Sequence, residues 1–245
     1  SLKSRFGNAV TQMQYPVDQG ENFNAIIDLL KMVMYKFPVD GGKPKKLPIP
    51  ESEKEKADKL HNELVEKAAE NDEKLMEKYF EQGTLDEDEM RQGLKLGMIR
   101  HDVFPVFVMS AKKNMRSGRM MGFIDNVAPT PLEAQPETSA DGNEVPLDPA
   151  KPTVLFVFKT HIEPNLGKLS FFKVISGEVT TSSELVNSQT GATERIHQLF
   201  IMDGKNRTPV DKLVTGDIGA TLKLKDTFTN QTLRAKGYDI TIQPI

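Results

Sequence analysis

Two hydrophobic periodicities, separated by a proline-rich stretch, constrain the fold of this 245-residue chain more than any other feature. Before residue 129, most apolar residues recur every three or four positions, which is typical of amphipathic helices. After residue 152, short apolar runs are separated by polar turn residues, which is typical of an antiparallel barrel or sandwich. We therefore predict an α/β domain over residues 1–132 and an all-β domain over residues 153–245. The intervening residues 133–152 are rich in proline and are expected to form a linker.

The middle of the first domain carries the strongest helical pattern. Capping-box spacing at Ser52–Glu55 and at Thr84–Glu87 predicts two helix starts. A break is expected at Asn71-Asp72, because asparagine and aspartate favour caps over helix interiors. Helix ends are predicted at Gly83 and at Gly97.

Shorter elements flank this helical region. A 3–4 spacing of apolar residues after Asn22 predicts a helix over residues 22–34, and four prolines with two glycines predict a loop over residues 38–50. The apolar run at residues 103–109 predicts a buried strand. A further amphipathic helix is expected over residues 120–127, before Pro129.

Composition excludes several kinds of chemistry. The chain has no cysteine, so disulfides, thiolate metal sites and cysteine nucleophiles are excluded. Its four histidines lack metal-ligand spacing. The net charge is −3, and the slightly basic character of residues 153–245 is too small a bias to argue for nucleic-acid binding by itself. No apolar run is long enough for a membrane-spanning helix. We predict no metal site and no catalytic residues, and we expect neither membrane nor DNA as a partner.

Several stretches, in the expected order, resemble bacterial translational GTPases of the elongation factor G family. The segment from Leu2 to Leu30, the charged helical stretch around "DEKLMEKY" and the strand "PVFVMSAKKN" resemble the end of the family's GTPase domain. "EPNLGKLSFFKVISGEV" and "ERIHQLFIMDGKNRTPVDKLVTGDIGATLKLKDTFTNQTL" resemble the family's second domain, a β-barrel. The implied fold is a partial α/β GTPase domain with a helical subdomain, followed by an all-β translation-factor-type barrel. The chain is then expected to be a fragment of a longer factor.

The resemblance also implies a limited set of functional residues. The family's phosphate loop, switches and Asn-Lys-x-Asp motif do not occur in this sequence. Only a guanine loop is expected, at Ser110, Ala111 and Lys112, and it would act in the full-length protein alone. GTP or GDP with magnesium is therefore expected for the full-length parent, whereas this chain is expected to bind no nucleotide and to be inactive.

The family's second domain touches small-subunit ribosomal RNA, which implies that this barrel docks on the ribosome. Candidate RNA contacts are the basic residues Lys168, Arg195, Lys205, Arg207, Lys223 and Lys225, because RNA backbones are met chiefly by lysine and arginine. The alternative is that they are ordinary solvated residues of strands and turns. A cytoplasmic protein that promotes translocation in translation is the expected parent.

Two alternatives stay open at this point. Arg116 and Arg119 lie where the family has a glycine-led helix start, which favours a paralogue, such as a ribosome-protection-type relative. An adaptor without GTPase activity, whose barrel binds RNA or protein, is the other alternative.

Overall fold

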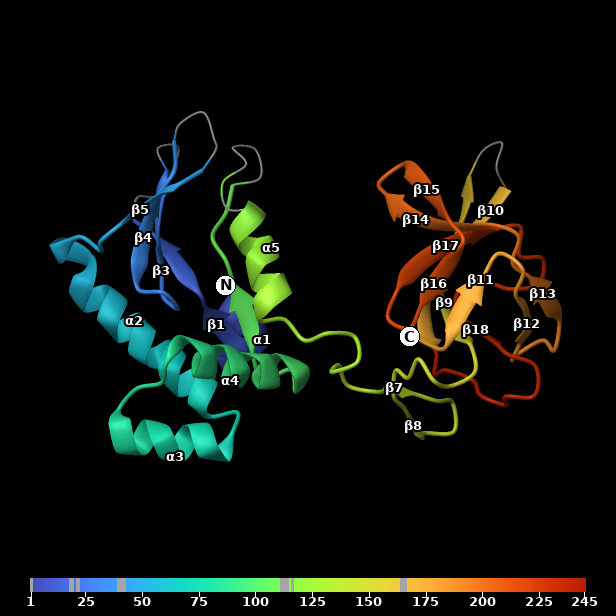
Figure 1. Cartoon of the computed structure of the whole chain (residues 1–245), viewed down its shortest axis with the longest axis horizontal. Helices are drawn as coiled ribbons and strands as arrows, with labels where there is room; N and C mark the ends of the chain where they lie inside the picture. The colour runs from blue at the N-terminus through green and yellow to red at the C-terminus, as the bar shows by residue number, and fades with distance from the viewer. Residues whose placement is uncertain are drawn as a thin grey trace. The chain divides into compact units, whose positions relative to one another are not determined.

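The computed structural model describes residues 2–17, 20, 23–38, 43–110, 115, 117–163 and 167–245. The chain divides into two compact units, Ser1–Pro129 and Thr130–Ile245 (Figure 1). Among the described helices, none is both long and apolar enough to cross a membrane.

Within the described residues, the first unit combines five helices with two small sheets. A four-stranded antiparallel sheet has the order β2-β3-β4-β5, and β1 pairs with β6 in parallel. The helices are α1 (Leu2–Phe6), α2 (Glu51–Ala69), α3 (Glu73–Gln82), α4 (Glu87–Ile99) and α5 (Ser117–Asn126), with a 3-10 turn at Gly7–Ala9. The strands are β1 (Val10–Gln12), β2 (Gln14–Pro16), β3 (Ala25–Asp28), β4 (Val33–Lys36), β5 (Lys45–Leu47) and β6 (Phe104–Val106).

The predicted break at Asn71-Asp72 and the predicted end at Gly83 are both confirmed. Asp72 is the N-cap of α3, and its carboxylate accepts hydrogen bonds from the backbone N–H groups of Lys74 and Leu75. Gly83 has the left-handed conformation that ends a helix, and its N–H donates to the Tyr79 carbonyl. Local sequence chemistry therefore determines where α3 begins and ends.

Other predicted helix boundaries are wrong. The capping box of α4 is Asp86–Glu89 rather than Thr84–Glu87, and α2 begins after Pro50 without a side-chain cap. Gly97 does not end α4, which continues to Ile99. A Cβ atom built on Gly97 would lie 2.4 Å from Cγ2 of Val103, so this glycine serves close packing instead.

The helix predicted at residues 22–34 is also wrong, since this segment forms β3 and β4. Ile26 and Ile27 are both fully buried, in hydrophobic clusters that differ in membership. A strand buried on both faces has no polar alternation, and its apolar spacing can imitate that of a helix. Residues 45–47, expected to be loop, form β5 because they pair with β4.

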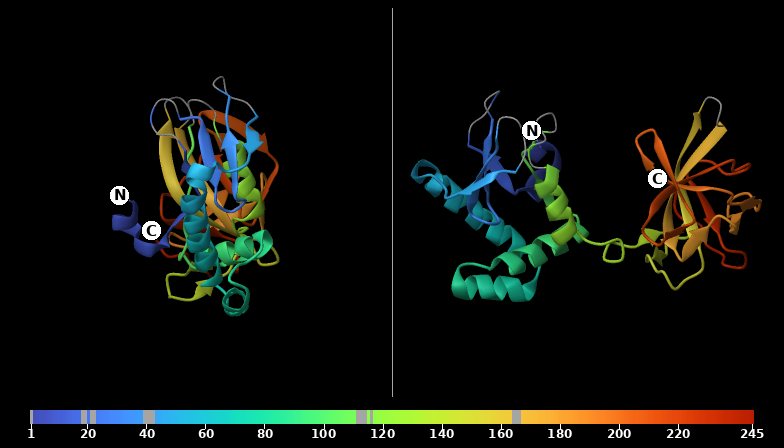
Figure 2. Two further views of the ribbon diagram at one scale, coloured as in Figure 1. Left: turned by 90° about the vertical axis from the view of Figure 1, so that its left-hand side faces the viewer. Right: turned by 45° about the horizontal axis from the view of Figure 1, so that its top comes forward.

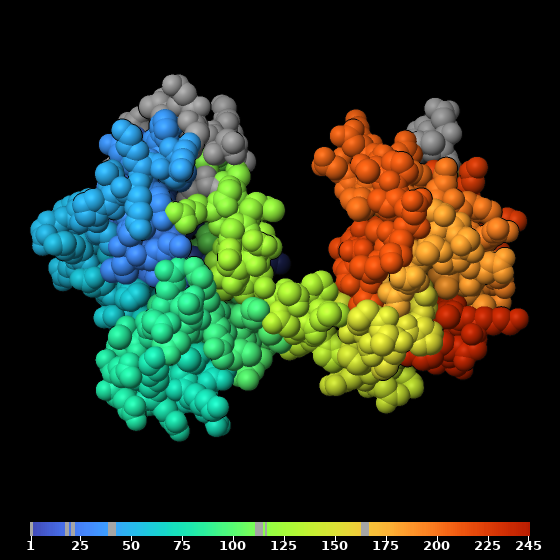
Figure 3. Space-filling view, in the orientation of Figure 1, coloured from blue at the N-terminus to red at the C-terminus, as the bar shows by residue number. Residues whose placement is uncertain are grey.

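The core of the first unit lies between the sheet and the helices. Tyr15 and Ile27 from the sheet belong to the same cluster as Leu64 of α2 and Leu94 of α4. In Figure 3, the residues of α2, α3 and α4, coloured light blue to green, form one closely packed body. The strand predicted at residues 103–109 is present as the shorter β6, but the prediction that it is buried is wrong, because Phe104 is exposed and Pro105 and Val106 are half-buried.

The second unit is a curled antiparallel sheet, which confirms the predicted barrel (Figure 2). Among the described residues, eight strands form one sheet in the order β13-β12-β18-β9-β10-β17-β14-β15, and β11 and β16 form a separate pair. The strands are β9 (Val154–Glu163), β10 (Gly167–Ser176), β11 (Glu178–Thr180), β12 (Glu184–Asn187), β13 (Thr193–Arg195), β14 (Leu199–Asp203), β15 (Asn206–Val210), β16 (Lys212–Val214), β17 (Ile218–Leu222) and β18 (Gln231–Arg234). The inner core includes Val157, Phe172, Leu199 and Leu233.

The segment 133–152, expected to be a linker, lies within this second unit. It contains the paired strands β7 (Glu137–Thr138) and β8 (Glu144–Val145). Val145 and Leu147 are buried, and Val145 packs with Phe156 and Ile242 of the barrel unit. Burial of these two apolar side chains is the physical reason that the segment packs on the barrel rather than extending as a linker.

Candidate nucleic-acid interface

Three of the six basic residues predicted to contact RNA meet at one place on the barrel. Lys168 lies at the start of β10, and Lys223 and Lys225 follow the end of β17. The backbone N–H of Lys223 donates to the carbonyl of Lys168 at 3.2 Å. Because β10 and β17 are paired, the polar segment after β17 lies beside the start of β10. We refer to this segment, residues 223–230, as the β17–β18 loop.

A buried carboxylate holds the first half of the β17–β18 loop. Glu194 of β13 is only 3% exposed. Its carboxylate accepts hydrogen bonds from the backbone N–H groups of Lys225, at 3.0 Å, and Asp226, at 2.7 Å. It also accepts from the hydroxyl of Thr227 at 2.9 Å. Three donors satisfy a buried charge that would otherwise be costly, so this part of the loop has one defined conformation.

A buried amide holds the second half of the loop. The Asn187 side chain of β12 is fully buried, and its Nδ2 donates to the Asp226 carbonyl at 3.1 Å and to Gln231 Oε1 at 3.0 Å. Gln231 Oε1 in turn accepts from the backbone N–H of Phe228 at 2.8 Å. This chain of hydrogen bonds links β12 to both ends of the segment around Phe228.

The Lys168 ammonium has partners within the protein. Its Nζ atom donates to the carbonyls of Lys225 and Thr227, both at 3.0 Å, and lies 4.0 Å from the centroid of the Phe228 ring. These contacts join the start of β10 to the β17–β18 loop. Lys168 therefore positions the loop, and the phosphate contact expected of it stays a prediction.

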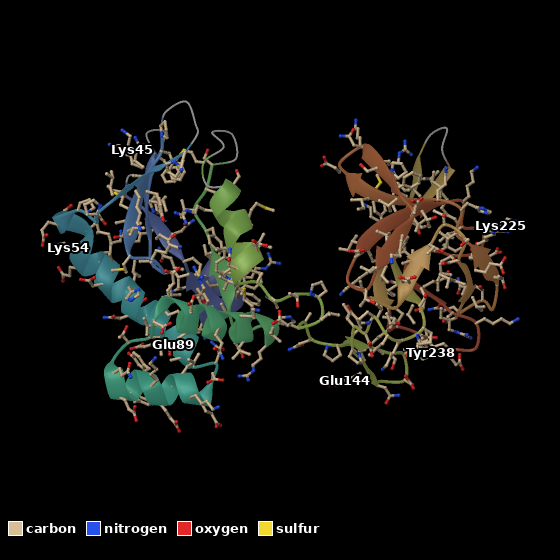
Figure 4. All side chains as sticks on the ribbon, in the orientation of Figure 1. Lys45, Lys54, Glu89, Glu144, Lys225 and Tyr238 are labelled. Carbon is tan, nitrogen blue, oxygen red and sulfur yellow. The ribbon has the colours of Figure 1, made fainter. Side chains whose placement is uncertain are left out.

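The other five residues predicted to contact RNA differ in exposure and in the element that carries them. Lys223, Lys225 and Arg195 are exposed, and Arg195 directly follows the loop-binding residue Glu194. Figure 4 labels Lys225 at the surface of the barrel. Lys205 and Arg207 come from another element, the β14–β15 hairpin, where Lys205 is exposed and Arg207 is half-buried. The structure thus places two exposed cations, Lys223 and Lys225, on the β17–β18 loop.

Sequence reasoning missed two apolar residues of this surface. Phe228 is 54% exposed and Ile162, the cross-strand partner of Lys168, is 76% exposed. The available signal was a phenylalanine placed between Thr227 and Thr229 in a polar turn, where the strand pattern requires no apolar residue.

The predicted guanine loop is described only in part. Ser110 forms a bridge with Met115, in which the Met115 N–H donates to the Ser110 carbonyl at 2.9 Å. Ala111 and Lys112 lie outside the described residues.

The first unit also contains a cavity of about 160 Å³, which is lined by Gln14, Phe107 and Arg119, among others. The buried Gln14 Oε1 has no hydrogen-bond partner among the described residues, and the cavity is large enough for an ordered water.

Comparison with known proteins identifies the barrel. Residues 152–236 match the family model described as elongation factor G domain 2. This match confirms the family resemblance that the sequence of the barrel suggested.

The fold of nearly the whole chain is found in a solved structure. A crystal structure of ttk003000868 from Thermus thermophilus matches with a TM-score of 0.78 at 19% sequence identity. The match covers 97% of this chain and 33% of that protein, so this chain spans about a third of its length. At this identity the likeness concerns the fold alone, and it covers both units of the chain.

Proposed function

We propose that this chain, which carries the second domain of the elongation factor G family at residues 152–236, belongs to a ribosome-associated factor that promotes translocation. In this proposal the barrel is the docking module, and its partner is small-subunit ribosomal RNA. The single observation that carries the proposal is the pair of exposed cations, Lys223 and Lys225, on the ordered β17–β18 loop.

Both the charge and the ordered backbone of the β17–β18 loop suit it to bind RNA. Lysine and arginine side chains on a protein surface bind RNA phosphates and release counterions. Lys223 and Lys225 extend from a backbone that Glu194 and Lys168 hold by hydrogen bonds. A loop that is ordered before binding loses less conformational entropy when it docks. The β17–β18 loop is therefore suited to present positive charge to an RNA backbone.

The proposal assigns GTP hydrolysis to the longer protein. This sequence lacks a phosphate loop, the switches and an Asn-Lys-x-Asp motif, and these elements supply phosphate and magnesium contacts in such GTPases. Ser110, Ala111 and Lys112 would contribute only the guanine loop. A cytoplasmic location follows from a role on the ribosome.

The test is a binding measurement between this chain and purified bacterial ribosomal subunits at several salt concentrations. We expect binding to the small subunit that weakens as salt rises. The double substitution Lys223→Glu with Lys225→Glu is expected to abolish it. Lys236→Glu is the matched control, because Lys236 is exposed and lies beyond the opposite end of β18. Equal loss in the control, or equal binding to both subunits, contradicts specific docking through this loop.

A second measurement separates the proposal from its alternatives. Fluorescent GTP is titrated against this chain and against the complete reading frame that encodes it. Binding by the longer protein alone supports a GTPase parent. If the longer protein binds ribosomal subunits but no GTP, the adaptor alternative replaces the proposed factor.

A further inference from the structure

We propose that the exposed ring of Phe228 is a stacking platform for an unpaired RNA base, with the neighbouring lysines contacting the flanking phosphates. This inference rests on the proposed function, and it specifies which part of the RNA the barrel binds. The partner of the ring would be an unpaired nucleotide. The positive charge of the lysines alone would attract single-stranded and duplex RNA alike.

The position of the ring is determined by the backbone on both sides of it. The Phe228 N–H donates to Gln231 Oε1 at 2.8 Å. The next residue, Thr229, accepts a hydrogen bond through Oγ1 from the backbone N–H of Thr160 at 2.9 Å. Phe228 is thus held between β9 and the start of β18 while the residue as a whole remains 54% exposed. An aromatic ring that is both exposed and held in place loses little freedom when a base stacks on it.

The Lys168 ammonium gives the ring a defined electrostatic environment. Its Nζ atom lies 4.0 Å from the ring centroid and is held by the carbonyls of Lys225 and Thr227. The cation interacts with the π-electrons of one ring face. Because two carbonyls hold the ammonium, it restrains the ring and leaves the exposed ring surface to a partner. Lys168 is thus a positioning residue for the platform.

The surroundings match the chemistry of a nucleotide. Ile162, the cross-strand partner of Lys168, adds exposed apolar surface, and Lys223 and Lys225 add exposed positive charge. Proteins bind single-stranded nucleic acid by combining aromatic rings, on which bases stack, with cations that follow the backbone. Paired bases within an RNA helix are not available for such stacking. The combination therefore favours an unpaired nucleotide over a duplex.

The experiment compares binding of this chain to the small ribosomal subunit, to a single-stranded oligouridine and to an RNA duplex of equal length. Phe228→Ala and Phe228→Leu remove the aromatic ring, and the leucine keeps an apolar side chain. Phe228→Tyr keeps a ring. Ile218→Ala is the matched control, because Ile218 is also an exposed isoleucine of the barrel but lies at the start of β17, the end away from the β17–β18 loop. Urea denaturation verifies that each variant folds.

We expect the alanine and leucine variants to weaken oligouridine and subunit binding by about 5- to 150-fold, which is the range measured for single stacked bases. The tyrosine variant and the Ile218→Ala control should stay within about threefold of the original chain on the same scale. The Phe228 ring protons should also shift upfield in NMR spectra when oligouridine is added. The duplex should bind more weakly and respond little to these substitutions.

The outcomes separate this inference from the proposed function. If the original chain binds the small subunit and the alanine and leucine variants bind equally well, the stacking platform is wrong and the docking proposal stands. If leucine preserves binding and alanine does not, the patch makes an ordinary apolar contact, and stacking is again wrong. If the original chain binds neither subunit nor RNA at any salt concentration, the proposed function itself fails.

Discussion

The carboxylate of Glu194 accepts a hydrogen bond of 2.7 Å from the backbone N–H of Asp226, which lies 32 residues further along the chain. Glu194 belongs to β13 and Asp226 to the β17–β18 loop, so one buried side chain connects the two elements. The exposed cations and the exposed ring proposed to contact RNA all depend on the conformation that this contact supports.

Replacement of Glu194 by glutamine should therefore loosen the β17–β18 loop. The amide group turns a donor toward backbone N–H groups and removes the charge, and we expect the free energy of unfolding to fall by about 2–3 kcal/mol. Urea denaturation measures this loss, and hydrogen exchange should show faster exchange of the Lys225 and Asp226 amides. Glu184→Gln is the control, because Glu184 is exposed on the neighbouring strand β12. Equal effects of the two substitutions would contradict a specific role for Glu194.

Two helical glycines should respond in opposite directions to alanine. A Cβ atom on Gly93 of α4 would lie 2.2 Å from the Ala68 carbonyl oxygen of α2, whereas one on Gly122 of α5 meets nothing within 4 Å. Gly93→Ala should thus lower the free energy of unfolding by about 1–3 kcal/mol through overpacking. Gly122→Ala should raise it by up to about 1 kcal/mol, because alanine restricts the unfolded chain. Thermal and urea unfolding of both variants test this pair, and stabilisation by Gly93→Ala would show that α2 and α4 do not approach so closely.

The start of α4 should lose stability in acid. Hydrogen bonds from the backbone N–H groups of Glu89 and Asp88 hold the pKa of the Asp86 carboxyl below its ordinary value. Because the pKa is lower in the folded chain, the ionised Asp86 carboxylate stabilises the fold fully above its unfolded-state pKa of about 3.9. This stabilisation is lost as the pH falls through the folded-state pKa. The difference in urea midpoint between the original chain and Asp86→Asn should therefore be larger at neutral pH than in strong acid. A difference that grows toward low pH would have the wrong sign, and Glu55→Gln, at an exposed position of α2, serves as control.

Each lysine that contacts an RNA phosphate should contribute to the salt dependence of binding. Lys225→Ala is expected to reduce the slope of log K against log salt by about 0.7 for single-stranded RNA. Titrations with oligouridine over a range of salt concentrations measure the slope. Lys212→Ala is the control, since Lys212 of β16 is ion-paired with Glu178 at 3.0 Å. An unchanged slope in Lys225→Ala would show that this side chain makes no phosphate contact.

Local patterns predicted some elements better than others. Asp72 and Gly83 were recognised as helix boundaries because a cap depends on the residue itself and on its immediate neighbours. Ile26 and Ile27 were assigned to a helix from the spacing of the apolar residues around them. Both are buried in the structure, and burial on two faces of a strand removes the alternation that would have identified it. Glu89 was missed as the capping-box partner of Asp86 because a second box, starting two residues earlier, fits the sequence equally well.

In the candidate site, too, some residues could be predicted from the sequence and others could not. Its basic residues could be listed from the sequence, since lysine and arginine are charged wherever they lie. Lys168 could not be assigned its role, because its partners are carbonyls 57 and 59 residues away. Phe228 could not be recognised as exposed, since its environment depends on β9, β12 and β18 together.

The sequence by itself determined the class of the second domain, the caps of α3 and the absence of cysteine chemistry, because each depends on residue type and on short spacing. Only the tertiary structure decided which lysine positions the β17–β18 loop and which ones face the solvent. The physical reason is that hydrogen bonds and burial between distant strands distinguish side chains that are chemically identical in the sequence.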